Sequence, residues 1–270
     1  MSRIEDAIES AMKRRGAGFA PASGVAEIEA QQEYPARPGK EAVRINRDNP
    51  NLIAINTSGK PEIAEEYRKL KSIIVRYSKN EGFRNTFVVT SSLGMEGKSL
   101  TALNIAVTMA QEYDHTVLLV DADIRKPSIA SYLGIEAARG VTDCLIDGVD
   151  LGDAIIKTDI GKLSFLPAGK RVDNPVELLS SQKMKNIITE IKTRYSNRYI
   201  IIDTPPILPF AETRTLSLLA DGVVFVVRES CASESNIKEA FELLGGSNLL
   251  GVVYNAATVG PGRSNHYYGY

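Results

Sequence analysis

Cysteine and histidine are scarce in this chain, which limits the chemistry available from thiols, imidazoles and transition metals. The 270 residues include two cysteines and two histidines. Cys144 and Cys231 have no cysteine or histidine near them at the spacing of metal ligands, so we interpret both as buried thiols of a protein from a reducing compartment. His115 opens an apolar run and His266 lies in a polar tail. Neither has a neighbour that would indicate a catalytic triad.

Long apolar runs and an excess of one charge are also missing. No apolar segment approaches the roughly 20 residues that a membrane-spanning helix needs, and the N-terminus lacks the apolar centre of a signal peptide. The 32 basic residues are balanced by 33 acidic ones, which gives no general attraction to nucleic acid or to anionic lipid. We therefore predict a soluble, cytoplasmic protein with no nucleic-acid partner.

The two ends of the chain differ in composition from its centre. Residues 2–15 place four apolar side chains on one side of a short helix, and the segment after it is rich in Ala, Gly, Pro and charge. We predict a tethered amphipathic helix with a flexible linker over 1–51, a folded domain over 52–258 and a flexible tail over 259–270. The short helix is either a solvated arm or a docking peptide for a partner.

From residue 61 onward, apolar segments alternate with helical patterns. A helix is predicted over residues 61–80, with an apolar stripe formed by Ile63, Tyr67, Leu70, Ile74 and Tyr77. Strands are predicted over residues 86–90, 115–121, 163–169, 199–205, 222–228 and 249–256, with helices between them, for example over 99–113, 175–195 and 235–244. The strands are apolar without alternation, as expected when both faces are covered.

This order of elements predicts an α/β fold. Alternating strands and helices form a doubly wound, mostly parallel sheet flanked by helices, with right-handed crossovers. Ligands of such sheets bind outside the carboxyl ends of the strands. The loops that follow the strands are therefore where functional residues should be sought.

The first of these loops is a degenerate phosphate-binding loop. Its sequence SSLGMEGKSL contains Gly97-Lys98-Ser99, as the motif requires, but Ser92 stands where the first glycine should be. Backbone N–H groups at the start of a helix can surround phosphate oxygens. Lys98 would reach the β- and γ-phosphates, and the Ser99 hydroxyl would bind Mg²⁺. We predict that the nucleotide contacts Ser92, Gly94, Met95, Glu96, Gly97, Lys98, Ser99 and Leu100.

Carboxylates end two further strands. Asp121 and Asp123 lie in LLVDADIRKP, and Asp203 closes IIID, which matches the Walker B pattern. Any one of them alone would be read as a helix cap or a surface turn. Three carboxylates in carboxyl-end loops together with a phosphate loop favour an ATP–Mg²⁺ site, with Ser99, Asp121 and Asp203 around the metal. Arg125 follows in the same loop, where it either steadies the transferring group or belongs to an interface.

The end of the chain carries three tyrosines that packing does not explain. Tyr267, Tyr268 and Tyr270 stand among Gly and Ser, so we predict that they are phosphoacceptors on a flexible tail. The residues after Asn255 could extend about 45–50 Å at roughly 3.3 Å each, which is enough to reach the nucleotide site of a neighbouring subunit. Asn255 itself, at the end of the last strand, is our candidate for an adenine contact.

A charged stripe runs along the helix that begins at Pro61. Glu65, Arg68 and Lys71 are three residues apart. They could form intrahelical salt bridges or a charged face that meets another subunit. Both readings stay open at this point.

Taken together, these motifs resemble those of bacterial tyrosine kinases of the exopolysaccharide and capsule group. SSLGMEGKS is similar to their Walker A motif, LLVDADIRKP to their additional Walker A′ motif and IIIDTPP to Walker B. LPAGKRVDNPVELLSS and the tyrosine-rich tail also match. The N-terminal MSRIEDAIESAMKRR is similar to that of stand-alone members linked to exosortase-type polysaccharide loci. The resemblance implies a P-loop NTPase fold, ATP and Mg²⁺.

The resemblance also implies a regulatory cycle. Tail tyrosines would be autophosphorylated in trans within a ring such as an octamer and dephosphorylated by a cognate phosphatase. Polysaccharide polymerisation and export would depend on this cycle. A membrane protein of the chain-length-determinant type would activate the kinase and recruit it to the inner face of the cell membrane. Glu65 and Arg68 match the family's ring-forming E-x-x-R-x-x-R motif, but Lys71 replaces its last arginine and loses bidentate pairing.

In this reading Lys98, Mg²⁺ and the loop amides offset charge on the γ-phosphoryl group. Tyrosine has a pKa near 10, so its hydroxyl needs a base, which is Asp121 or Asp123, with Asp121 favoured. One alternative is a septum-positioning or plasmid-partitioning ATPase of the same fold. Those proteins carry a second lysine early in the phosphate loop, where this chain has Leu93. The other alternative is a non-catalytic, ATP-switched adaptor of a polysaccharide exporter.

Overall fold

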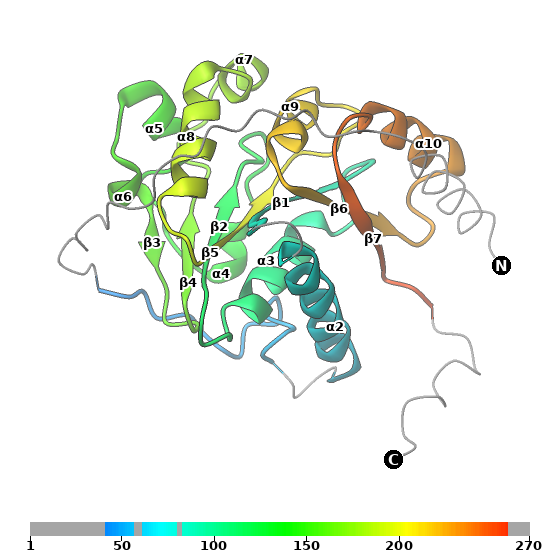
Figure 1. Cartoon of the computed structure of the whole chain (residues 1–270), viewed down its shortest axis with the longest axis horizontal. Helices are drawn as coiled ribbons and strands as arrows, with labels where there is room; N and C mark the ends of the chain where they lie inside the picture. Colours follow the sequence, from blue (N-terminus) through cyan, green and yellow to red (C-terminus); the bar gives the residue numbers. More distant parts are fainter. Residues whose placement is uncertain (1–40, 57–60, 80–82, 259–270) are drawn as a thin grey trace.

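The computed structural model describes residues 41–56, 61–79 and 83–258. Its centre is a single twisted sheet with helices on both faces (Figure 1). The predicted helix over 2–15, the linker as far as residue 40 and the three tail tyrosines lie outside the described residues. Nothing in the described part of the chain forms a helix that is both long and apolar enough to cross a membrane.

The sheet has seven strands in the order β3-β4-β2-β5-β1-β6-β7. The strands are β1 Thr86–Ser91, β2 Thr116–Asp121, β3 Ile156–Lys157, β4 Leu163–Leu166, β5 Arg198–Asp203, β6 Gly222–Arg228 and β7 Leu249–Asn255. All neighbours are parallel except β3 and β4. The predicted α/β, mostly parallel fold is confirmed. Only the two-residue edge strand β3 was not predicted, because it is too short to show a period.

The described helices are α2 Pro61–Ser78, α3 Lys98–Met109, α4 Ile129–Leu133, α5 Val141–Asp147, α6 Leu151–Ala154, α7 Pro175–Leu179, α8 Gln182–Thr193, α9 Glu212–Leu219 and α10 Glu234–Leu243. The single helix predicted over 175–195 was wrong, because it is interrupted between α7 and α8. Ser181 caps the second piece, and its hydroxyl accepts a hydrogen bond from the Met184 amide at 3.2 Å. A side-chain oxygen at this position starts a new helix.

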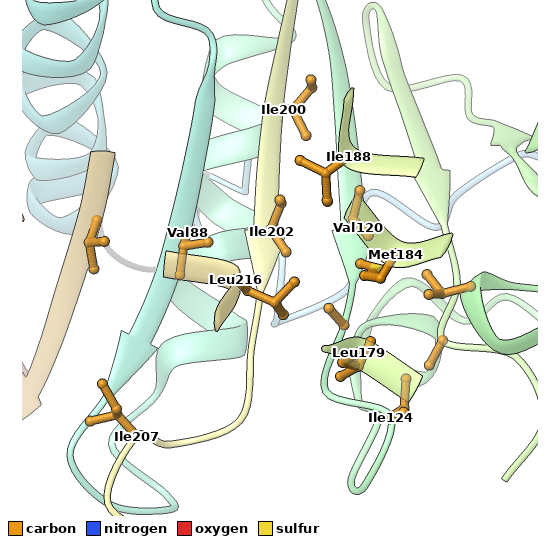
Figure 2. Packing of buried hydrophobic residues seen from close by; sticks show 14 of the residues in the cluster. Val88, Val120, Ile124, Leu179, Met184, Ile188, Ile200, Ile202, Ile207 and Leu216 are labelled. Carbon is orange, nitrogen blue, oxygen red and sulfur yellow. The ribbon is translucent and has the colours of Figure 1, made fainter. Parts of the chain in front are cut away.

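Two apolar layers enclose the sheet, one on each face. Figure 2 shows the first layer, in which Val88, Val120 and Ile202 of the central strands point toward side chains of α7, α8 and α9. Phe87 and Val89, the neighbours of Val88 along β1, belong to the second layer with α2 and α3. Successive strand residues thus enter opposite layers, which explains why the strand sequences lack polar alternation.

The domain boundary predicted at residue 51 needs correction for the part of the linker that the structure describes. The Val43 amide donates to the Lys157 carbonyl at 2.9 Å, and the Ile45 amide donates to Asp159 Oδ1 at the same distance. The Ile45 side chain is buried in the second apolar layer. Isolated apolar residues in a polar segment show no period, so the sequence did not reveal that this segment packs on the domain.

Two further predictions need correction. Four of the five stripe residues of α2, namely Tyr67, Leu70, Ile74 and Tyr77, pack in the second apolar layer, but Ile63 is 37% exposed. The two thiols also differ, because Cys144 is buried and Cys231 is exposed. Burial raises the pKa of the Cys144 thiol to about 11, so this side chain is chemically inert at neutral pH.

Candidate nucleotide-binding site

The phosphate loop connects β1 to α3 at the carboxyl edge of the sheet. Two of its residues have left-handed backbone angles, Met95 with φ 67° and Gly97 with φ 88°. A Cβ atom on Gly97 would lie 2.2 Å from Asn255 Nδ2, the end of a side chain that can move, so it is mainly the left-handed backbone that favours glycine at this position. The Met95 side chain is 78% exposed. Left-handed φ at a residue other than glycine is uncommon and costs energy, and it is often found at functional sites.

Ser92 and Glu96 hold the start of this loop. The Ser92 hydroxyl donates to Glu96 Oε2 at 2.8 Å, and the Leu93 amide donates to the same oxygen at 2.7 Å. Both side chains are fully buried. A carboxylate at the centre of the loop thus takes over the turn that the missing glycine makes in the standard motif. The geometry favours a role for both side chains in shaping the loop, which leaves phosphate binding to backbone amides further along it.

Lys98, the first residue of α3, lies among acidic and hydroxyl side chains. Its Nζ is 2.6 Å from Asp123 Oδ2, donates to Ser99 Oγ at 3.0 Å and lies 3.6 Å from Asp203 Oδ1. Burial acts to lower the pKa of Lys98, but attraction to Asp203, Asp123 and Asp121 outweighs it, so the pKa lies above the usual value. The lysine is therefore a buried, permanently charged cation at the site where phosphate would bind.

Asp203 ends β5 and lies opposite Asp121 of β2 in the strand register. It is completely buried, and within the described chain neither of its carboxylate oxygens has a hydrogen-bond partner. Burial raises its pKa to about 6, although Lys98 opposes this shift. Leaving a buried carboxylate without hydrogen bonds is costly. The Lys98 ammonium lies 3.6 Å from Oδ1, beyond hydrogen-bond distance, so the two oxygens could accept hydrogen bonds from the water shell of a Mg²⁺ ion.

The described carboxylates would not hold that ion alone. No three His, Cys, Asp or Glu side chains among the described residues gather closely enough to form a metal site. Mg²⁺ usually binds through one or two carboxylates, water and the phosphates of a substrate. Ser99 and Asp203 on one side and nucleotide phosphates on the other would match that pattern.

Asp121 caps backbone amides at the start of α4, in addition to lying in the site. Its Oδ2 accepts hydrogen bonds from the Ser128 and Ile129 amides, both at 3.2 Å, and its Oδ1 accepts one from the Asp123 amide at 3.2 Å. Burial and the charge of Asp203 raise its pKa well above the usual value. Asp121 therefore organises the loop after β2 and still lies beside the other carboxylates of the site.

Two further predicted residues, Arg125 and Asn255, make side-chain contacts near the phosphate loop and the loop after β2. Arg125 Nε donates to Glu212 Oε1 at 2.5 Å, and Asn255 Nδ2 donates to the Glu96 carbonyl at 2.9 Å. Glu212 is a site residue that sequence reasoning missed, because an acidic residue in the first turn of a helix is ordinary. Asn255 supports the phosphate loop, and its contact with adenine stays a prediction.

The charged stripe of α2 divides into two ion pairs. Arg68 pairs with Glu65 at 2.5 Å on the same helix, and both side chains are about half exposed. Lys71 instead pairs with Glu112, just beyond the end of α3, at 2.7 Å. The stripe is remote in sequence from the phosphate loop. Its role in oligomerisation stays a prediction.

Several known proteins are similar to this chain in sequence and in fold. Residues 85–243 match a protein family described as AAA domain. The chain is similar to the tyrosine-protein kinase YwqD of Bacillus subtilis, with 34% identity over 233 residues, which cover 84% of this chain and 96% of that protein. It is also similar to the crystal structure of the chimerical protein CapA2B2, with a TM-score of 0.68, 31% identity, and coverage of 76% of this chain and 88% of that one.

A more distant neighbour supports the fold alone. Cobyrinic acid a,c-diamide synthase from Mycobacterium smegmatis has a TM-score of 0.52 and 21–22% identity, covering 63% of this chain and 73–74% of that one, in crystal structures with ATP analogue or ADP and magnesium. That protein therefore shares the fold of this chain, and its crystal structures contain magnesium and a nucleotide.

Proposed function

The chain belongs to the family of bacterial tyrosine-protein kinases, and from this premise we propose that it transfers the γ-phosphoryl group of ATP to tyrosines of its own C-terminal tail. The observation that carries the proposal is the buried cluster at the carboxyl edge of the sheet. There the Lys98 ammonium lies between Asp123 and Asp203, next to the hydroxyl of Ser99. Phosphoryl transfer depends on such charge placement more than on covalent help from the protein.

We assign the residues of the site as follows. Lys98 and the amides between Gly94 and Leu100 would bind the phosphates, and Ser99 and Asp203 would hold Mg²⁺, with Asp121 beside them. When bound, Mg²⁺ supplies positive charge to the β- and γ-phosphate oxygens. Asp203 must then be ionised, and a cation close to its unpaired oxygens would favour that form.

The acceptors would be Tyr267, Tyr268 and Tyr270. A tyrosine hydroxyl is protonated at neutral pH, so a carboxylate must take its proton as the bond from its oxygen to the γ-phosphorus forms and the bond from that phosphorus to the leaving ADP breaks. We keep Asp121 as the proposed base, since its Oδ1 accepts a single amide hydrogen bond and retains a lone pair, whereas Oδ2 accepts two. Asp123 is engaged with Lys98 and would serve mainly to position that lysine.

The partners follow the same premise and are proposals. We propose a ring-forming homo-oligomer in which the tail of one subunit reaches the site of the next, using the Glu65 and Arg68 side of α2. Because Lys71 is paired within its own subunit, it contributes less to such a ring than an arginine would. A membrane activator, a cognate phosphatase and control of polysaccharide export would complete the cycle at the inner face of the cell membrane.

Purified full-length protein incubated with γ-labelled ATP and Mg²⁺ tests the proposal. We expect label on tyrosine of the chain itself, measured after acid hydrolysis, and none when Mg²⁺ is removed by a chelator. Release of free phosphate without phosphotyrosine would instead identify a positioning-type ATPase. The absence of both products would identify a nucleotide-switched adaptor.

A further inference from the structure

Arg125 and Glu212 form an ion pair that joins the loop after β2 to the start of α9, the helix that follows β5. Arg125 lies two residues beyond Asp123, and Glu212 is the first residue of α9. Arg125 Nε donates to Glu212 Oε1 at 2.5 Å. Because β2 and β5 are neighbouring parallel strands, the pair lies at the same edge of the sheet as Asp121 and Asp203, where those strands end.

The stability of the fold does not explain Glu212. Its side chain is completely buried, yet Oε2 has no hydrogen-bond partner in the described part of the chain. A buried ion pair with incomplete hydrogen bonding repays little of its desolvation cost, and apolar residues in its place often leave a protein as stable or more stable. We therefore look for the role of the Glu212 carboxylate in its effect on Arg125.

Two contacts hold the Arg125 side chain, and part of its guanidinium remains accessible to a ligand. Its guanidinium carbon lies 4.5 Å from the centre of the Phe210 ring, and Glu212 engages its Nε. The side chain remains 31% exposed. Its two terminal nitrogens donate no hydrogen bond to any described residue. The edge that carries these two nitrogens matches two oxygens of a phosphoryl group.

We propose that Glu212 and Phe210 are positioning residues that hold Arg125 so that its terminal nitrogens bind oxygens of the phosphoryl group during transfer. This inference rests on the proposed kinase function and deepens it. It assigns Arg125 to the transferring group rather than to an interface. A guanidinium that is already ordered loses less entropy when the charged group reaches it, and charge placed before the reaction lowers the barrier most.

A double-mutant cycle tests the proposal, with initial rates of phosphotyrosine formation measured at varied MgATP. Arg125→Met should lower kcat at least about a hundredfold, given the size of arginine effects in phosphoryl transfer. Glu212→Gln, which keeps the size and an acceptor but loses the charge, should lower kcat about tenfold. KM for ATP should stay within about twofold in both. In the double variant, kcat should equal that of Arg125→Met alone.

Three results would overturn the inference. If Glu212→Gln lowers kcat by the same factor with and without Arg125, its role is structural. If raising the protein concentration restores the rate of Arg125→Met, the arginine serves an interface. If Arg125→Lys is as active as the wild type, bidentate donation by the two terminal nitrogens is not needed, because lysine keeps only the charge.

Two further variants keep the test informative if Arg125→Met or Glu212→Gln fails to fold. Phe210→Leu keeps an apolar side chain under Arg125, and we expect kcat to fall about threefold in the wild type and not at all beside Arg125→Met. Glu234→Gln removes a charge from an exposed ion pair on α10, where Glu234 Oε1 lies 2.6 Å from Lys238, and should change nothing. A wild type without any phosphotyrosine would refute the proposed function itself, whereas an active wild type with independent mutational effects would refute only this inference.

Discussion

Replacing Lys98 by methionine is expected to lower the rate of tyrosine autophosphorylation by about a thousandfold or more. Methionine keeps much of the side-chain volume and removes the positive charge that lies within ion-pair distance of both Asp123 and Asp203. The charge that develops on the transferring phosphoryl group then lacks its nearest protein cation. Initial rates of phosphotyrosine formation at saturating ATP and Mg²⁺ measure the effect.

Lys185→Met is the matched control, because Lys185 lies exposed on α8. It should leave the rate unchanged. Lys98→Met also leaves the buried carboxylates without their cation, so its folding should be checked by its unfolding temperature. A folded Lys98→Met protein that retains more than about a tenth of the wild-type rate would contradict the assignment of this loop as the phosphate site.

Replacing Asp203 by asparagine is expected to stabilise the nucleotide-free protein while abolishing phosphoryl transfer. The pKa of Asp203 is raised to about 6 in the folded protein, so folding favours its neutral form. Between about pH 4, the unfolded value, and pH 6, the wild type loses stability as pH rises, and above pH 6 the full cost is present. Asparagine removes that cost, which amounts to about 1–3 kcal/mol.

Urea unfolding without nucleotide or Mg²⁺ measures this effect at pH 4.5 and pH 7.5. The gain in the free energy of unfolding should be clearly larger at pH 7.5. Asp114→Asn, an exposed substitution just before β2, should show no such dependence. If Asp203→Asn destabilises the protein at pH 7.5, the carboxylate already has a stabilising partner and does not await a cation.

The central strands could be predicted almost to the residue, because both faces of each are covered and the sequence then shows uninterrupted apolar runs. β1, β2 and β5 carry such runs; β1 ends just before the phosphate loop, and β2 and β5 end at Asp121 and Asp203. The kink between α7 and α8 depends on one capping serine, and the packing of Ile45 depends on one apolar residue in a polar segment. Neither leaves a periodic signal.

The site was predicted where a motif fixes spacing and missed where chemistry depends on contacts across the chain. Lys98, Asp123 and Asp203 meet as the motifs indicate, and the resemblance to bacterial tyrosine kinases is confirmed by 34% identity to one of them. Glu212 reaches Arg125 across 87 positions of the chain. Glu96, which holds the loop through Ser92 and Leu93, also accepts a hydrogen bond from the Arg228 amide, 132 positions away. No local pattern indicates such pairs.

The transfer of phosphate from the site of one copy to the tail of another can be measured directly by intact-mass spectrometry. Full-length Lys98→Met, which cannot phosphorylate itself, is mixed with ATP, Mg²⁺ and a wild-type chain that ends at Thr258. We predict that the full-length variant gains up to three phosphates, lost in turn on replacing Tyr267, Tyr268 and Tyr270 by phenylalanine. A full-length variant that stays unmodified, while the intact wild type phosphorylates itself under the same conditions, would contradict transfer between copies.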